Sequence, residues 1–198
     1  MTRTREFWKI VGLCVLASVI YGVVHDQITA RICIEYFTVF HPTIVDSEDP
    51  TVIGLVWGVV ATWWMGLFLG VLVGLACVIG QWPALRARRL VGPLLILLAG
   101  MALSALLAGV VGWQVGEPLA RMAIQVGPPE ARDRDPRLPN PQMPTPWIPR
   151  ANAKAFAADL AAHNASYFVG FWGGIGLGVY AVLKRRKLAP LGAAVKMI

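Results

Sequence analysis

Charged residues are absent from four long stretches of the chain, and apolar residues fill most of each stretch. These stretches are residues 10–24, 51–85, 90–116 and 160–183. A helix of roughly 17 to 25 apolar residues crosses a hydrocarbon core of about 30 Å and satisfies its own backbone hydrogen bonds there. The pattern therefore predicts an all-α integral membrane protein with four transmembrane helices. We expect these helices at about residues 7–24, 51–80, 90–115 and 160–183.

The composition and the distribution of charge also favour a membrane location. Hydrophobic residues make up 57% of the chain and charged residues only 15%, whereas an ordinary soluble domain is about 45 to 50% apolar. If the N-terminus is cytoplasmic, the inner segments hold eleven Lys and Arg against one acidic residue, and the outer segments hold seven against ten. Basic residues gather on the cytoplasmic side of membrane proteins. We therefore expect a multi-pass protein of the bacterial inner (plasma) membrane, oriented N-in/C-in.

The net charge of +7 does not indicate nucleic-acid binding, because the basic residues flank the predicted helices. The expected partner is instead the lipid bilayer. The basic N-terminus followed by an apolar run also fits a secretory signal peptide, but no small-x-small cleavage site precedes His25. We therefore interpret this run as the first transmembrane helix.

The first outer loop, residues 25–50, carries an alternating pattern. Polar and apolar residues alternate from Gln27 to Tyr36, which is typical of a half-buried strand. The alternative is an amphipathic helix at the membrane interface, with Arg31 and Glu35 paired at i, i+4. We therefore expect this loop to form either an extended strand or a helix at the membrane interface.

The second outer loop, residues 116–152, differs sharply in composition from the rest of the chain. It contains nine of the fourteen prolines and a run of mixed charge. A segment of this composition cannot bury a core of its own. We expect both loops to belong to a single transmembrane domain that spans residues 1–198.

Two predicted helices carry glycines at four-residue spacing, which lets another helix approach closely in lipid. The glycines on the second helix are Gly66, Gly70 and Gly74, and those on the fourth are Gly170, Gly174 and Gly178. We expect these two helices to pack on each other. The same faces would suit a homo-oligomer or partner membrane subunits.

The three histidines lie where predicted helices meet the outer membrane boundary, which makes this boundary the candidate functional site. Imidazole and carboxylate groups together suit zinc, copper or iron. The candidate ligands, not all acting together, are His25, Glu35, His41, Asp159 and His163. Other polar residues expected near this site are Asp26, Arg31 and Tyr167. An extended loop between His25 and His41 would span roughly 50 Å, so we expect His25 rather than His41 to join His163.

The sequence contains no strong metal or catalytic motif, and it assigns no catalytic residue or reaction. The polar residues could instead hydrogen-bond to the loop backbone and position it, or form a proton or ion path. The leading hypothesis is a metal or small-molecule site at the outer face. The alternative is a non-catalytic membrane subunit that assembles through its glycine-rich faces.

The stretch HDQITARICIEYFTVFHP, from His25 to Pro42, resembles a loop of small bacterial multi-span membrane proteins with no assigned activity. The resemblance extends to the HNASY segment and covers under a fifth of the chain. It implies no chemistry of its own. It marks five residues for attention, namely His25, Asp26, Glu35, His41 and His163.

Overall fold

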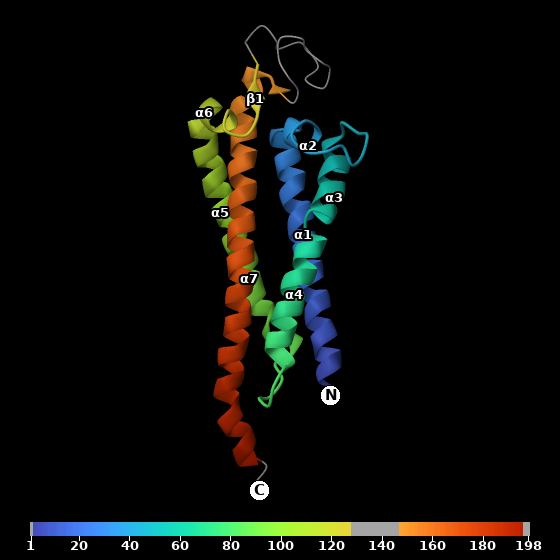
Figure 1. Cartoon of the computed structure of the whole chain (residues 1–198), viewed down its shortest axis with the longest axis vertical. Coiled ribbons are helices and arrows are strands. Elements are labelled where there is room, and N and C mark those ends of the chain that lie inside the picture. The colour runs from blue at the N-terminus through green and yellow to red at the C-terminus, as the bar shows by residue number, and fades with distance from the viewer. Residues whose placement is uncertain (1, 128–146, 196–198) are drawn as a thin grey trace. The chain divides into compact units, whose positions relative to one another are not determined.

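The computed structural model describes residues 2–127 and 147–195, which are mostly helical (Figure 1). The longer elements are α1 (Arg3–Ile32), α3 (Pro50–Val60), α4 (Trp63–Val78), α5 (Val91–Val115) and α7 (Ala153–Val195). The short elements are α2 (Glu35–Thr38), η1 (Ala87–Arg89), α6 (Glu117–Ala120), β1 (Gln125–Val126), β2 (Trp147–Ile148) and η3 (Arg150–Asn152). Four helical segments are long and apolar enough to cross a membrane. The predicted helical class and number of candidate spans are therefore confirmed.

The prediction of a strand from Gln27 to Tyr36 is wrong, because α1 continues as a helix to Ile32. The buried positions here are Asp26, Thr29 and Ala30 within the helix and Cys33 directly after it. Their spacing of i, i+3, i+4 and i+7 is that of one helix face. Apolar residues also lie on the exposed side of this helix, as Ile28 and Ile32 do, so the alternation of polar and apolar residues did not mark buried and exposed faces.

The alternative pairing of Arg31 with Glu35 is not formed either. Arg31 donates to the Gln27 side-chain oxygen (2.9 Å) and to Thr51 Oγ1 (2.8 Å). Gln27 Nε2 also donates to the Thr51 carbonyl (2.8 Å). These bonds connect the end of α1 to the start of α3.

The chain divides into two compact units, each built from several segments. Unit 1 comprises Met1–Tyr21, Val60–Gly100 and Phe168–Ile198, and unit 2 comprises Gly22–Val59 and Met101–Tyr167. Each unit has its own cluster of buried apolar residues.

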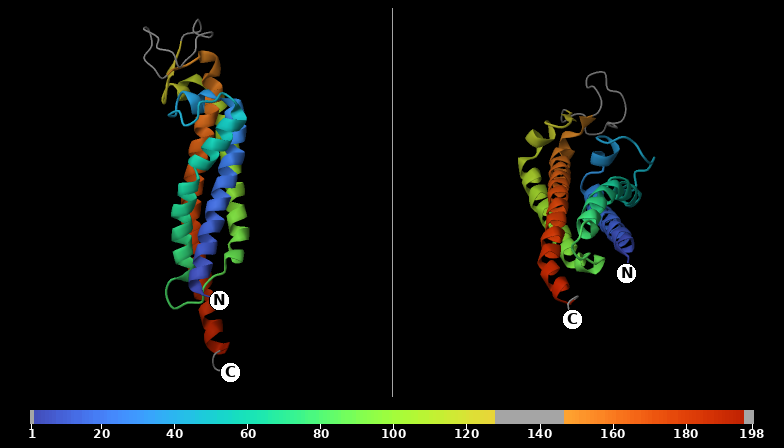
Figure 2. Two further views of the ribbon diagram at one scale, coloured as in Figure 1. Left: turned by 90° about the vertical axis from the view of Figure 1, so that its right-hand side faces the viewer. Right: turned by 60° about the horizontal axis from the view of Figure 1, so that its bottom comes forward.

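In unit 1, the start of α1, the connection from α4 to α5 and the end of α7 lie at the same end of the unit (Figures 1 and 2). Arg185, on α7, is buried there with 2% of its surface exposed. Its guanidinium donates to the carbonyls of Ala76 (2.7 Å), Ile79 (2.7 Å), Trp82 (3.0 Å) and Pro83 (2.9 Å). These bonds satisfy carbonyls at the end of α4, where Ala76 and Ile79 lie, and in the turn that follows, where Trp82 and Pro83 lie.

The glycines of α4 pack mainly on α1, not on α7 as the sequence predicted. A Cβ atom added at Gly66 would lie 2.9 Å from the Val15 Cα, and one added at Gly70 would lie 3.2 Å from the Val11 Cα. A Cβ added at Gly74 would meet the Phe7 ring at 2.8 Å. Residues this small are needed on α4 because its backbone runs so close to α1.

The α7 glycines do not form one packing stripe. A Cβ added at Gly174 would meet the Leu69 side chain at 2.7 Å, so one contact between α7 and α4 does form as predicted. A Cβ added at Gly178 would have nothing within 4 Å. Glycine spacing alone therefore did not identify the partner helices correctly.

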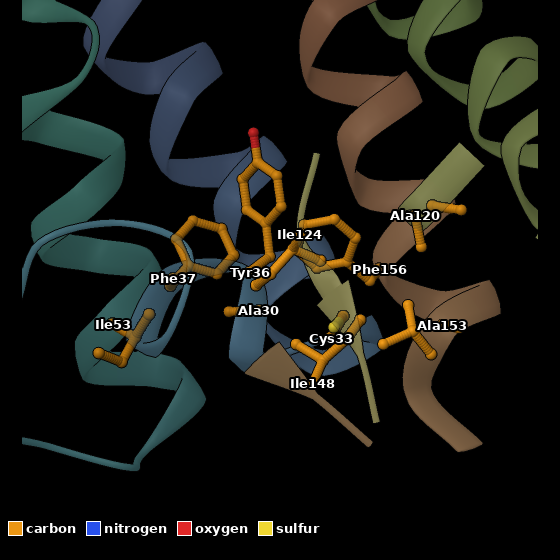
Figure 3. Packing of buried hydrophobic residues seen from close by; sticks show 12 residues of the cluster. Ala30, Cys33, Tyr36, Phe37, Ile53, Ala120, Ile124, Ile148, Ala153 and Phe156 are labelled. Carbon is orange, nitrogen blue, oxygen red and sulfur yellow. The ribbon is translucent and has the colours of Figure 1, made fainter. Parts of the chain in front are cut away.

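In unit 2, the buried apolar cluster draws residues from α1, α2, α3, α6, β1, β2 and α7 (Figure 3). The parallel pairing of β1 with β2 joins Val126 to Ile148, and both residues belong to this cluster. Trp147, the other β2 residue, is also fully buried. The described parts of the proline-rich loop thus help build a shared core, while residues 128–146 lie outside the described residues. In Figure 3 the Tyr36 hydroxyl points away from the other side chains of the cluster.

Candidate functional site

The helices of unit 2 bring His25 and Asp26 of α1 next to His163 of α7. A close approach of α3 supports α1 at this point, because a Cβ added at Gly54 would lie 2.8 Å from the Asp26 carbonyl oxygen. Gly58 lies even closer to α1, since a Cβ there would be 2.4 Å from the Val23 Cα. The two glycines therefore let α3 hold the site-bearing part of α1.

His163 is buried, with 2% of its surface exposed, and both of its ring nitrogens face defined groups. Nδ1 lies 2.8 Å from the Asp159 backbone carbonyl. A carbonyl can only accept, so Nδ1 carries a hydrogen and donates it. Nε2 faces the Asp26 carboxylate, 3.3 Å from Oδ1. In neutral His163 this nitrogen presents its lone pair to Asp26.

His25 completes a group of three candidate ligands. Within the described residues, His25, Asp26 and His163 each offer one ligand atom, and these atoms lie within 4.8 Å of one another. The ring centroids of His25 and His163 are 4.6 Å apart and the rings are nearly perpendicular at 79°. Two imidazoles and a carboxylate are donors that zinc and other first-row transition metals accept.

Aromatic side chains fix the orientation of the His163 ring. Tyr36 stacks on it, with centroids 4.4 Å apart and planes inclined by 26°. Phe37 approaches it at 5.6 Å and Tyr167 at 6.1 Å. Burial, together with the nearby Tyr167, Asp159 and Asp26 side chains, raises the pKa of Tyr36, so its hydroxyl stays protonated. Tyr36 was not among the predicted site residues, because the sequence pattern indicated only an apolar position at the end of a half-buried strand.

Asp159 lies one helical turn from His163, and its side chain is fully buried. Neither carboxylate oxygen has a hydrogen-bond partner among the described residues. The Cys33 peptide group is nearby, but its N–H already donates to the Thr29 carbonyl at 2.9 Å. The Asp26 carboxylate lies close enough to Asp159 that negative charges on the two groups would repel each other. A buried polar group without a partner is costly, so this carboxylate needs an explanation.

Glu35, predicted as a ligand, has other partners in the structure. One oxygen accepts from the Asn152 amide (2.5 Å) and the other from the Cys33 thiol (3.3 Å). Burial, reinforced by the nearby Glu35 and Asp159, raises the pKa of Cys33 and keeps the thiol protonated. Glu35 therefore joins α2 to η3, which directly precedes α7, and lies outside the three-residue group.

His41, also predicted as a ligand, lies beside this group but not in it. Its Nδ1 donates to the Tyr36 carbonyl at 2.7 Å, and its ring packs against Trp57 at 5.0 Å. Burial lowers the pKa of His41, and the neighbouring His163 lowers it further. The Tyr36 carbonyl and Asp26 act in the opposite direction.

Of the three remaining predicted residues, Tyr167 and Asp26 lie at the site and Arg31 does not. Tyr167 lines the site from α7 and is about half exposed, at 51%. Arg31 is bonded to Gln27 and Thr51 on the outer side of α1, and no described contact joins it to the histidines. Asp26, expected only as a neighbour of the site, is the carboxylate that faces His163 directly.

The spacing of Asp26 and His163 suits a shared metal ion. The distance of 3.3 Å between Nε2 and Oδ1 lies just beyond the usual range of about 2.7 to 3.2 Å for an N–H···O hydrogen bond. Two ligand atoms at about 2.0 to 2.2 Å from a tetrahedral Zn²⁺ lie roughly 3.3 to 3.6 Å apart. The Nδ1–H bond to a backbone carbonyl is also the support that metal-bound histidines usually have.

No known protein family, curated protein or solved structure matches this chain.

Proposed function

We propose that this chain is a four-span protein of the bacterial inner membrane that binds one transition metal ion through His25, Asp26 and His163. The observation that carries the proposal is the position of His163. Its Nδ1 is committed to a backbone carbonyl and its Nε2 faces a buried carboxylate at 3.3 Å. Zinc is the ion that this spacing and these donors fit best.

The proposed orientation is N-in/C-in. Exposed basic residues support it, because they gather in the segments assigned to the cytoplasm. These residues are Arg3, Arg5, Lys9, Arg86, Arg88, Arg89, Lys184, Arg186 and Lys187. In this orientation the proposed metal site lies at the outer membrane face.

The competing proposal of a non-catalytic subunit has weaker support. It relied on glycine faces being open to partner helices. Gly66, Gly70 and Gly74 instead meet α1 of the same chain.

Metal content of the full chain, purified in mild detergent and dialysed against buffered Zn²⁺, tests the proposal. With free Zn²⁺ buffered near the wild-type dissociation constant, we expect zinc to bind the wild type at one site per chain. We expect His163→Gln to bind it at least about tenfold more weakly, because losing even an outer-shell partner weakens a metal site 10- to 100-fold. His41→Gln is the matched control, since this histidine is close to the group but bonded to Tyr36. Equal zinc content in wild type and His163→Gln would refute the proposal.

A further inference from the structure

The three-ligand group does not account for Asp159. Its carboxylate is fully buried, and neither oxygen has a hydrogen-bond partner among the described residues. The helix carries Asp159 and His163 on one face, four residues apart. The Asp159 main chain already belongs to the site, because its carbonyl accepts the His163 Nδ1–H bond.

The charge of the proposed site points in the same direction. A divalent ion held by two neutral imidazoles and one carboxylate leaves a buried group with a net charge of +1. Burying a charge without a counter-charge is strongly unfavourable. A second carboxylate would make the site neutral. Glu35 already accepts two hydrogen bonds from Asn152 and Cys33, whereas the Asp159 carboxylate is uncommitted.

We propose that Asp159 is the fourth protein ligand of the metal ion, an inference that rests on the proposed function. Its carboxylate lies outside the group of atoms within 4.8 Å of one another, so ligation requires the Asp159 side chain to rotate toward the ion. The site then has two imidazole and two carboxylate ligands. Four protein ligands are typical of a closed site, whereas a catalytic zinc keeps a position for water. The ion is therefore held, sensed or passed on, and does not activate a water molecule.

Cobalt binding and its response to azide test this inference on the full chain. Co²⁺ occupies zinc sites and has a visible spectrum that changes when an added anion enters an open coordination position. We expect wild-type protein to bind Co²⁺ with a spectrum that azide does not change. Asp159→Asn should bind Co²⁺ at least about tenfold more weakly, and azide should then alter its spectrum. Glu35→Gln, a matched carboxylate change nearby, should behave as wild type.

Two results would overturn the inference while leaving the proposed function intact. One is a wild-type Co²⁺ spectrum that azide changes, a test that needs no variant. The other is an Asp159→Asn protein with wild-type Co²⁺ affinity and no azide response. Wild-type protein that binds no Co²⁺ or Zn²⁺ would instead contradict the proposed function, and the fourth ligand with it.

Discussion

At the scale of single residues, His163 shows how its surroundings define the state of a side chain. A backbone carbonyl selects the tautomer, Tyr36 stacks on the ring, and Asp26 faces the second nitrogen. All of these contacts come from main chain or from buried side chains, which have little freedom to move. The ring is thus held in one orientation before any ligand binds, which lowers the entropic cost of binding.

His41 predicts a pH dependence of stability. Its pKa lies below the usual value of 6.5, chiefly because it is buried. The unfolded chain therefore takes up a proton at a higher pH than the folded chain, and acid favours unfolding. This contribution is fully present above about pH 6.5 and is lost as the pH falls toward the folded-state pKa. We expect the wild type to lose more stability than His41→Gln between about pH 7.5 and about pH 5.5.

Urea unfolding in detergent at several pH values measures this difference. Gln can still donate to the Tyr36 carbonyl, so the comparison isolates the titration of the ring. Parallel pH profiles for the wild type and His41→Gln would show that His41 does not contribute.

At the scale of elements, close approach between helices is specific to individual glycines. A Cβ added at Gly58 would lie 2.4 Å from the backbone of Val23, whereas one added at Gly178 would meet nothing within 4 Å. The first glycine is required by packing in unit 2, and the second is not required by any described contact.

We therefore expect opposite effects from the same substitution at these two positions. Gly58→Ala should lower the free energy of unfolding by about 1 to 3 kcal/mol, the usual effect of overpacking. Gly178→Ala should leave it unchanged or raise it by up to about 1 kcal/mol, because Ala favours the helix. Thermal or urea unfolding of the two variants tests this pair. Equal effects of the two substitutions would mean that α3 does not lie this close to α1.

A second prediction concerns Arg185, which lies in unit 1. Its guanidinium donates to four carbonyls around the end of α4, and a Lys ammonium cannot reproduce that planar geometry. Arg185→Lys should destabilise the protein by about 1 to 3 kcal/mol for the carbonyls left without donors. Arg186→Lys, on the exposed neighbour, should change stability by less than about 0.5 kcal/mol.

The measurement for this pair is the midpoint of thermal unfolding in the same detergent. An Arg185→Lys midpoint equal to that of Arg186→Lys would show that the carbonyl contacts do not stabilise unit 1.

The long helices could be predicted from the sequence because each contains a charge-free apolar stretch long enough to cross a membrane. The end of α1 could not, since Gln27, Thr29 and Arg31 look like loop residues. They are tolerated in a helix because Gln27 and Arg31 bond to each other and to Thr51, which lies 24 residues after Gln27 and 20 after Arg31. Such contacts are not visible in local periodicity.

Part of the candidate site could also be predicted from the charge-free stretches. His25 and His163 could be placed at one boundary by counting spans, whereas the roles of Asp26 and Tyr36 depended on α1 remaining helical. The continued helix places Asp26 on the buried face, and the short α2 turns Tyr36 back onto His163.

At the scale of the whole molecule, the proposed orientation can be tested by cysteine labelling. The three native cysteines are buried, so they give little background. Thr43→Cys and Arg88→Cys each introduce one exposed thiol. In spheroplasts, a membrane-impermeant maleimide should label Thr43→Cys and should label Arg88→Cys only after lysis. The reverse pattern would mean that the chain is oriented N-out/C-out.

In the proposed site, imidazole and carboxylate groups from α1 and α7 bind one metal ion. X-ray absorption at the zinc edge of the purified, zinc-loaded chain identifies these ligands. We expect two imidazole nitrogens with oxygen ligands at about 2.0 to 2.2 Å and no sulfur. Zinc that lacks imidazole scattering, or that shows a sulfur ligand at about 2.3 Å, would rule this site out.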